Sequence, residues 1–160
     1  ANPDGRFQLG RAGVGVCVRA GAPLPDVSST EALKRALLEA ESVFHTQASS
    51  GTYVAQLLER LGVAAKIRGK IRSYHDAQET FTHLLNSKGR DIGFGGIPEI
   101  QRWHGRGLRL VAPLPPEIQN YTAYLAALMA DPPNRDGARA FFAFLAGAEA
   151  KSLLVAHGVS

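Results

Sequence analysis

Residues 43–52 read Val43-Phe44-His45-Thr46-Gln47-Ala48-Ser49-Ser50-Gly51-Thr52, a short apolar segment followed by a turn of small residues. A helix is then predicted over 51–62, because apolar residues recur at helical spacing, and Gly62 ends it. These apolar residues are Tyr53, Val54, Leu57, Leu58 and Leu61. The start of a helix gathers free backbone N–H groups and the positive end of the helix dipole at one point. We therefore expect this strand–turn–helix step to hold a small anion or polar ligand, through N–H groups at 50–52.

The rest of the chain alternates between strand and helix patterns. Apolar and β-branched runs predict strands at 13–19, 42–46, 66–74, 91–94, 108–111 and 121–128. Helical spacing predicts helices after Ser28, Asp76 and Asn134, a short helix over 98–103 and a last helix over 148–156. Ser28 and Glu31 together form the pattern of a capping box. This alternation predicts an α/β fold, with a mostly parallel sheet flanked by helices.

Three segments fall at the predicted carboxyl ends of strands, which is where open α/β sheets bind ligands. The first is the turn at 49–52, the second opens the helix after Asp76, and the third follows the strand at 91–94. We predict eight residues in these segments as ligand-binding residues: Ser49, Ser50, Gly51, Thr52, Ala77, Gln78, Gly95 and Gly96.

Composition limits the class of protein. The 160 residues are 45% hydrophobic, enough for a folded core in one domain or one and a half small lobes. The net charge of +4 is spread along the chain, so we expect no nucleic-acid partner. Lys66, Arg68, Lys70 and Arg72 alternate with other residues and would share one strand face, but aromatic residues are absent among them, which favours a solvated face. The single cysteine, Cys17, excludes an internal disulfide and is expected to be buried.

Residues capable of catalysis or metal binding do not form a recognisable set. His45 and His75 each lie at a predicted strand end and could face one cleft, either as metal ligands or as ordinary hydrogen-bonded histidines. A third ligand at suitable spacing is missing, so we expect neither a metal site nor a cofactor. Paired carboxylates and a nucleophile with its base are also missing from the strand ends, so we expect binding rather than catalysis.

Several segments resemble those of molybdate-type bacterial extracytoplasmic solute-binding proteins, in order, along nearly the whole chain. They are Gly13-Val14-Gly15-Val16, Gly21-Ala22-Pro23-Leu24-Pro25-Asp26, Leu33-Lys34-Arg35-Ala36-Leu37-Leu38, Ser49-Ser50-Gly51-Thr52, Leu58-Glu59-Arg60-Leu61-Gly62, Asp91-Ile92-Gly93-Phe94, Pro113-Leu114-Pro115, Gln119-Asn120-Tyr121-Thr122 and Phe141-Phe142-Ala143-Phe144-Leu145. The resemblance implies the type 2 periplasmic binding protein fold, in which two α/β lobes joined by crossover strands close on a ligand for an ABC importer.

The resemblance also implies how the chain is divided. Residues 14–120 would form the second lobe, which is the α/β ligand-binding half, and residues 1–13 and 121–160 would form the crossover and remnants of the first lobe. The N-terminal part of the first lobe would then be lacking, and the fragment would be able to form a homodimer through the face left uncovered. Location in the periplasm and an ABC transporter permease as partner of the full-length protein follow from the same resemblance.

The implied ligand is a small anion or polar solute. The turn from Ser49 to Thr52 matches the family's oxyanion cradle in kind, and the loop at Ala77 and Gln78 matches a further backbone contact. The molybdate binders place a tyrosine where this chain has Gly95 or Gly96, a departure that argues against molybdate itself. Two alternatives stay open: the effector-sensing domain of a LysR-type transcription regulator, and an enzyme with a related α/β cleft.

Overall fold

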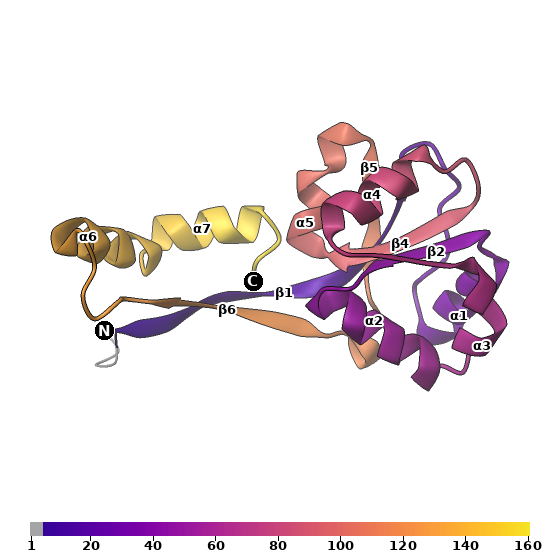
Figure 1. Ribbon diagram of the computed structural model, residues 1–160, viewed down its shortest axis with the longest axis horizontal. Helices are drawn as coiled ribbons and strands as arrows, with labels where there is room; N and C mark the ends of the chain where they lie inside the picture. The colour runs from indigo at the N-terminus through magenta and orange to yellow at the C-terminus, as the bar shows by residue number, and fades with distance from the viewer. Residues whose placement is uncertain (1–4) are drawn as a thin grey trace. The chain divides into compact units, whose positions relative to one another are not determined.

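The computed structural model describes residues 5–160 (Figure 1). Residues 1–4, which belong to the predicted first-lobe segment 1–13, lie outside the described residues. Contacts divide the chain into two compact units. Unit 2 comprises Gly13–Asn120, and unit 1 combines residues 5–12 with Tyr121–Ser160. The assignment of these units to two lobes stays a prediction.

The sheet to which unit 2 contributes most of its strands has the order β3-β2-β4-β1-β5. These strands are β1 (Arg6–Arg19), β2 (Ser42–Thr46), β3 (Ile71–Tyr74), β4 (Asp91–Gly96) and β5 (Leu108–Pro113). β2 is parallel to both β3 and β4, whereas β1 is antiparallel to both β4 and β5. The predicted α/β fold with a mostly parallel sheet is therefore confirmed, with β1 as the strand that runs against the others.

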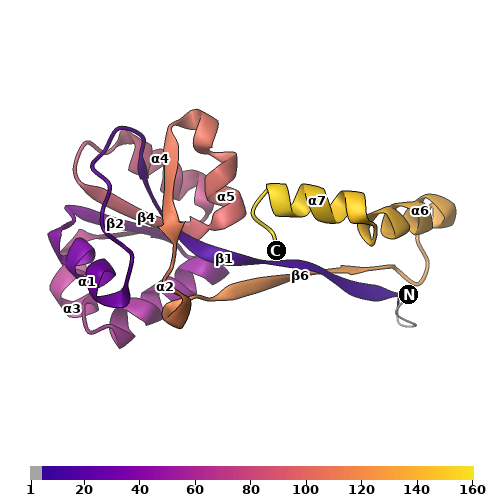
Figure 2. The same ribbon diagram turned by 180° about the vertical axis from the view of Figure 1, so that it is seen from behind.

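Helices cover both faces of this part of the sheet (Figures 1 and 2). On one face pack α1 (Thr30–Glu39), α2 (Ser49–Arg60) and the short α3 (Ala64–Ile67). On the other face pack α4 (Ala77–Asn86) and α5 (Ile97–Arg102). Three 3₁₀ turns complete unit 2, at Arg68–Lys70, His104–Arg106 and Pro116–Ile118.

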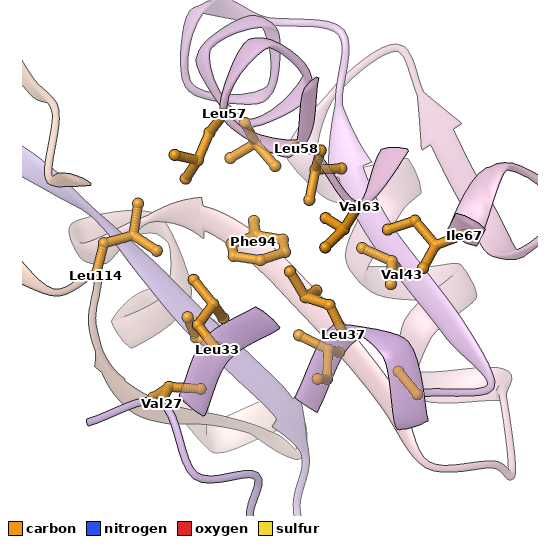
Figure 3. Packing of buried hydrophobic residues seen from close by; sticks show 14 of the residues in the cluster. Val27, Leu33, Leu37, Val43, Leu57, Leu58, Val63, Ile67, Phe94 and Leu114 are labelled. Atoms are coloured by element: carbon orange, nitrogen blue, oxygen red, sulfur yellow. The ribbon is translucent and has the colours of Figure 1, made fainter. Parts of the chain in front are cut away.

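Strand alternation divides the buried side chains between the two faces. Phe94 of β4 lies among leucines of α1 and α2, including Leu37, Leu57 and Leu58 (Figure 3). Cys17 points to the other face, where it packs with Phe81 of α4 and with Trp103. The predicted burial of Cys17 is thus confirmed, and Trp103 is buried beside it.

The segment at 66–74 corrects one sequence-based prediction. Its alternating charges suggested a single strand, but residues 64–67 form α3, and only Ile71–Tyr74 is strand. Val63, Ala64 and Ile67 are buried with the leucines of α1 and α2. This packing outweighs the preference of the alternating pattern for a strand. Consequently the four basic residues do not share one strand face; Lys70 instead donates from Nζ to the carbonyl of Leu38 at 2.7 Å.

The capping box predicted at Ser28 is also wrong. Both the N–H and the hydroxyl of Ser28 donate to Asp26 Oδ1, at 3.0 and 2.6 Å. With Ser28 held in this turn, α1 begins one residue later, and the Oγ of Ser29 accepts from the N–H of Ala32. The helices predicted after Asp76 and Asn134 begin where expected, because those two side chains do cap them.

Unit 1 contains β6 (Tyr121–Ala127), which pairs with β1, and the helices α6 (Arg135–Leu145) and α7 (Ala148–Ala156). The rings of Phe7 and Phe142 meet edge to face with centroids 4.8 Å apart. The predicted strand near 121–128 and both closing helices are confirmed. Among residues 5–160, no helix is both long enough and apolar enough to cross a membrane.

Candidate ligand-binding site

The three predicted segments meet at one edge of the sheet. β2 lies between β3 and β4 and is parallel to both, with Thr46 opposite Tyr74 and Phe44 opposite Gly93. The carboxyl ends of these strands therefore lie side by side. The structure brings together residues 49–52 after β2, Ala77 and Gln78 after β3, and Gly95 and Gly96 at the end of β4.

The start of α2 differs from the starts of α1, α4 and α6, whereas α7 also has no side-chain cap, at Gly147. The helices α1, α4 and α6 have Ser29, Asp76 and Asn134 at their N-caps, and each side chain accepts a hydrogen bond from a first-turn N–H. The N-cap of α2 is Ala48, whose methyl group has no acceptor atom. Each cap accepts from the N–H three residues further on, so at α2 it is the corresponding N–H of Gly51 that has no side-chain acceptor.

The donors lie one residue earlier than the sequence suggested. The helix begins at Ser49 rather than at Gly51, so the N–H of Thr52 already donates to the carbonyl of Ala48, at 2.9 Å. The first-turn N–H groups are therefore those of Ser49, Ser50 and Gly51 instead of residues 50–52. Ser49 and Thr52 are exposed and Ser50 is half-buried, so hydroxyl groups also reach the surface of this turn. A helix cap does not explain the serines, because both lie inside the helix.

Gly51 has a packing role of its own. It is buried, and a Cβ at this position would overlap the carbonyl group of Thr46 at the end of β2. The absence of a side chain lets the first turn of α2 lie directly on the strand end. Thr46 supports the same turn, since its Oγ1 accepts from the N–H of Ala48 at 3.2 Å.

The start of α4 is electrostatically different from that of α2. Asp76 accepts from the N–H of Glu79 at 2.8 Å, and Glu79 Oε2 accepts from the N–H of His75 at 3.1 Å. Ala77 is half-buried and Gln78 is exposed at this start. Two carboxylates here offset the helix dipole, whereas the first turn of α2 carries no acidic side chain. Of the two helix starts, α2 is the better one for an anion.

The glycines of β4 are explained in part by packing. A Cβ on Gly95 would lie 2.7 Å from the Phe81 ring, and one on Gly93 would lie 2.6 Å from Leu84. The absence of a side chain at these two glycines lets α4 pack closely on the sheet. Gly96 differs from them, because a Cβ there would point into open space.

The histidines near this edge have ordinary environments. His45 is buried, and its Nδ1 lies 2.9 Å from the carbonyl oxygen of Thr46. His75 is exposed. Within residues 5–160, no group of three or more His, Cys, Asp or Glu side chains is placed to hold a metal ion.

A pocket of about 340 Å³ in unit 2 lies at the opposite edge of the sheet. It is bounded by Val18, by residues 90–92 at the start of β4, and by the face of α1 that carries Ala32 and Ala36. Its lining includes none of the eight predicted residues.

These observations define an α/β domain that presents an uncapped helix start and two further strand ends at one sheet edge. A family model described as bacterial extracellular solute-binding protein matches residues 1–160, and the chain belongs to this family.

Individual relatives are more distant. An aconitate isomerase from a Pseudomonas species is 27% identical over 157 residues, which is 98% of this chain and 58% of that protein. The structure of the periplasmic molybdate-binding protein of Azotobacter vinelandii superposes with a TM-score of 0.74 at 17% identity, covering all of this chain and 69% of that one. The chain thus spans little more than half the length of its curated relative. The structural likeness supports the type 2 solute-binding fold.

The regulator alternative has weaker support. The effector-binding domain of a BenM variant superposes with a TM-score of 0.56 at 15% identity, covering 94% of this chain and 68% of that one. At such identity the likeness shows the fold alone.

Proposed function

We propose that this chain is the ligand-binding part of a transport protein for a small anion or polar solute. The observation that carries the proposal is the start of α2, where Ala48 leaves the N–H groups of Ser49, Ser50 and Gly51 without a side-chain cap. A ligand oxygen placed there would accept from these groups and meet the positive end of the helix dipole. The proposal is supported by membership in the solute-binding family and by the fold that the chain shares with a molybdate-binding protein.

The remaining parts of the mechanism are proposals as well. The Ser49, Ser50 and Thr52 hydroxyls would supplement the N–H groups, and Ala77, Gln78 and Gly96 would line the same edge. Closure of two lobes would add the remaining groups that contact the ligand. The whole protein would act in the periplasm and deliver its ligand to an ABC transporter permease.

NMR titration of the chain tests the binding site directly. Molybdate, tungstate, sulfate and citrate are added separately to uniformly ¹⁵N-labelled protein. We expect at least one of them to shift the amide signals of Ser49, Ser50 and Gly51 in a saturable way. The matched variant Ala48→Asp places a carboxylate over the same N–H groups and should abolish these shifts. Saturable shifts confined to other residues, or equal shifts in Ala48→Asp, would show that the ligand binds somewhere other than the first turn of α2.

An isomerase is the second candidate, and the 27% identical aconitate isomerase is the observation that favours it. The proton NMR spectrum of cis- or trans-aconitate incubated with the protein distinguishes the two functions. Conversion of one isomer into the other by the wild type but not by a heat-denatured control would establish catalysis. Binding without conversion supports the transport proposal.

A further inference from the structure

Gln119 makes an unusual set of hydrogen bonds at the boundary of unit 2. The N–H of Val14 donates to Gln119 Oε1 at 2.8 Å, and Gln119 Nε2 donates to the carbonyl oxygen of Val14 at 2.9 Å. The side-chain amide thus pairs with Val14 as the backbone of a neighbouring strand would. Oε1 also accepts from the N–H of Asn120 at 2.9 Å, and the N–H of Leu114 donates to the same Val14 carbonyl at 3.0 Å.

The neighbouring glycine makes room for this side chain. A Cβ on Gly13 would lie 3.1 Å from both Cδ and Nε2 of Gln119, which is tighter than ordinary van der Waals contact. Gly13 and Asn120 are also the first and last residues of unit 2. The amide of Gln119 therefore joins the two segments through which the chain enters and leaves this unit.

This junction lies at the edge of the sheet that carries the candidate site. Val14 pairs with Gly96 at the end of β4, and the end of β4 neighbours the end of β2. Val14 is thus connected by strand pairing to the edge that carries the candidate site.

We propose that Gln119 is a positioning residue that ties both chain connections of unit 2 together, so that they bend as one. An amide is suited to this role because it carries a donor and an acceptor side by side, whereas an ionised carboxylate can only accept. The inference rests on the proposed function in one respect: a binding protein that closes on its ligand needs a defined hinge.

Distance measurements between spin labels test the proposal without any ligand, so its failure is distinct from failure of the proposed site. Labels are placed on cysteines introduced at Thr82 in unit 2 and Ser152 in unit 1, both exposed positions, while native Cys17 is fully buried. In the labelled Gln119→Leu variant, the distribution of distances between the two spin labels should be clearly broader than in the labelled protein that keeps Gln119. Should Gln119→Leu fail to fold, Gln119→Asn, which is one methylene shorter, gives the same comparison.

The control variant is Thr30→Ala. The hydroxyl of Thr30 donates to Glu117 Oε1 at 2.7 Å and so holds the same chain segment to α1, without touching Val14. This variant should lower stability while leaving the distribution unchanged. Equal broadening in Thr30→Ala, or an unchanged distribution in folded Gln119→Leu, would overturn the proposal.

The variant Gln119→Glu adds a chemical test. At neutral pH its carboxylate would oppose the carbonyl oxygen of Val14, and the distribution should broaden. A protonated carboxyl group offers one donor and one acceptor, like the amide, so at a pH near the ordinary glutamate pKa of about 4 the distribution should narrow toward that of the wild type at the same pH. Broadening that does not depend on pH would contradict the role of the paired bonds.

Discussion

Gly51 illustrates how much a single residue can decide at this edge. Its Cα lies against the carbonyl group of Thr46, so the close approach of α2 to β2 depends on the absence of a Cβ. We expect Gly51→Ala to lower the free energy of unfolding by about 1–3 kcal/mol, because the added methyl must displace backbone. Gly69→Ala is the matched control, since a Cβ there would meet open space. Its effect should stay within about 0.5 kcal/mol in urea denaturation; equal effects of the two substitutions would refute the packing argument.

Cys17 provides a pH-dependent prediction at the same scale. Complete burial raises the pKa of its thiol far above the ordinary value, so the folded protein keeps the proton at a pH where the unfolded chain loses it. The stability contributed by the neutral thiol is present below the ordinary thiol pKa and is lost as pH rises above it. Between pH 9 and 11 the free energy of unfolding should fall by about 1.4 kcal/mol per pH unit more in the wild type than in Cys17→Ala. Parallel pH profiles of the two proteins in urea denaturation would show that the thiol ionises in the folded state.

At the scale of elements, α2 lacks the stabilising N-cap hydrogen bond that α1, α4 and α6 each have. The N-cap residues of α1, α4 and α6 accept first-turn hydrogen bonds, and Ala48 does not. Ala48→Asn should therefore raise the free energy of unfolding by about 0.5–2 kcal/mol, whereas Asp76→Ala at α4 should lower it by a similar amount. Thermal unfolding followed by circular dichroism measures both. A loss of stability in Ala48→Asn would mean that these N–H groups are already satisfied.

At the scale of the whole molecule, unit 1 has little core of its own. Eight of the ten large hydrophobic residues exposed among residues 5–160 belong to it, including Phe141 at 62% and Val155 at 57%. Phe144, one turn away from Phe141 on α6, is exposed as well. Exposed apolar residues in such number favour association.

Self-association of this chain therefore stays a prediction, to be measured by sedimentation velocity. We expect the sedimentation coefficient of the wild type to rise with protein concentration, and that of the double variant Phe141→Lys with Val155→Lys to rise less, because two charges would have to be buried in the contact. A wild type that remains monomeric at the highest concentration would contradict the expectation.

Particular residues show why sequence reasoning succeeded at some places and failed at others. Asp76 and Asn134 were identified as caps because the hydrogen bond they make is local. Ser28 was misassigned because Asp26, two residues away, competes for it. The strand predicted at 66–74 was wrong because burial of Ile67 against distant leucines outweighs a local alternation of charges. The pairing of Gln119 with Val14 joins residues 105 positions apart and left no signal in the sequence.

The sequence by itself determined the α/β class, most helices and strands, and the choice of three strand ends as the place to look for a ligand. These features depend on interactions between residues a few positions apart, which periodicity and capping patterns record. Only the tertiary structure decided which residues of α2 keep unsatisfied donors, why Gly51, Gly93 and Gly95 must be glycine, and that Gln119 joins the two connections of unit 2. Each of these depends on how closely two distant segments approach, and that separation is set by the packing of the whole unit rather than by any local pattern.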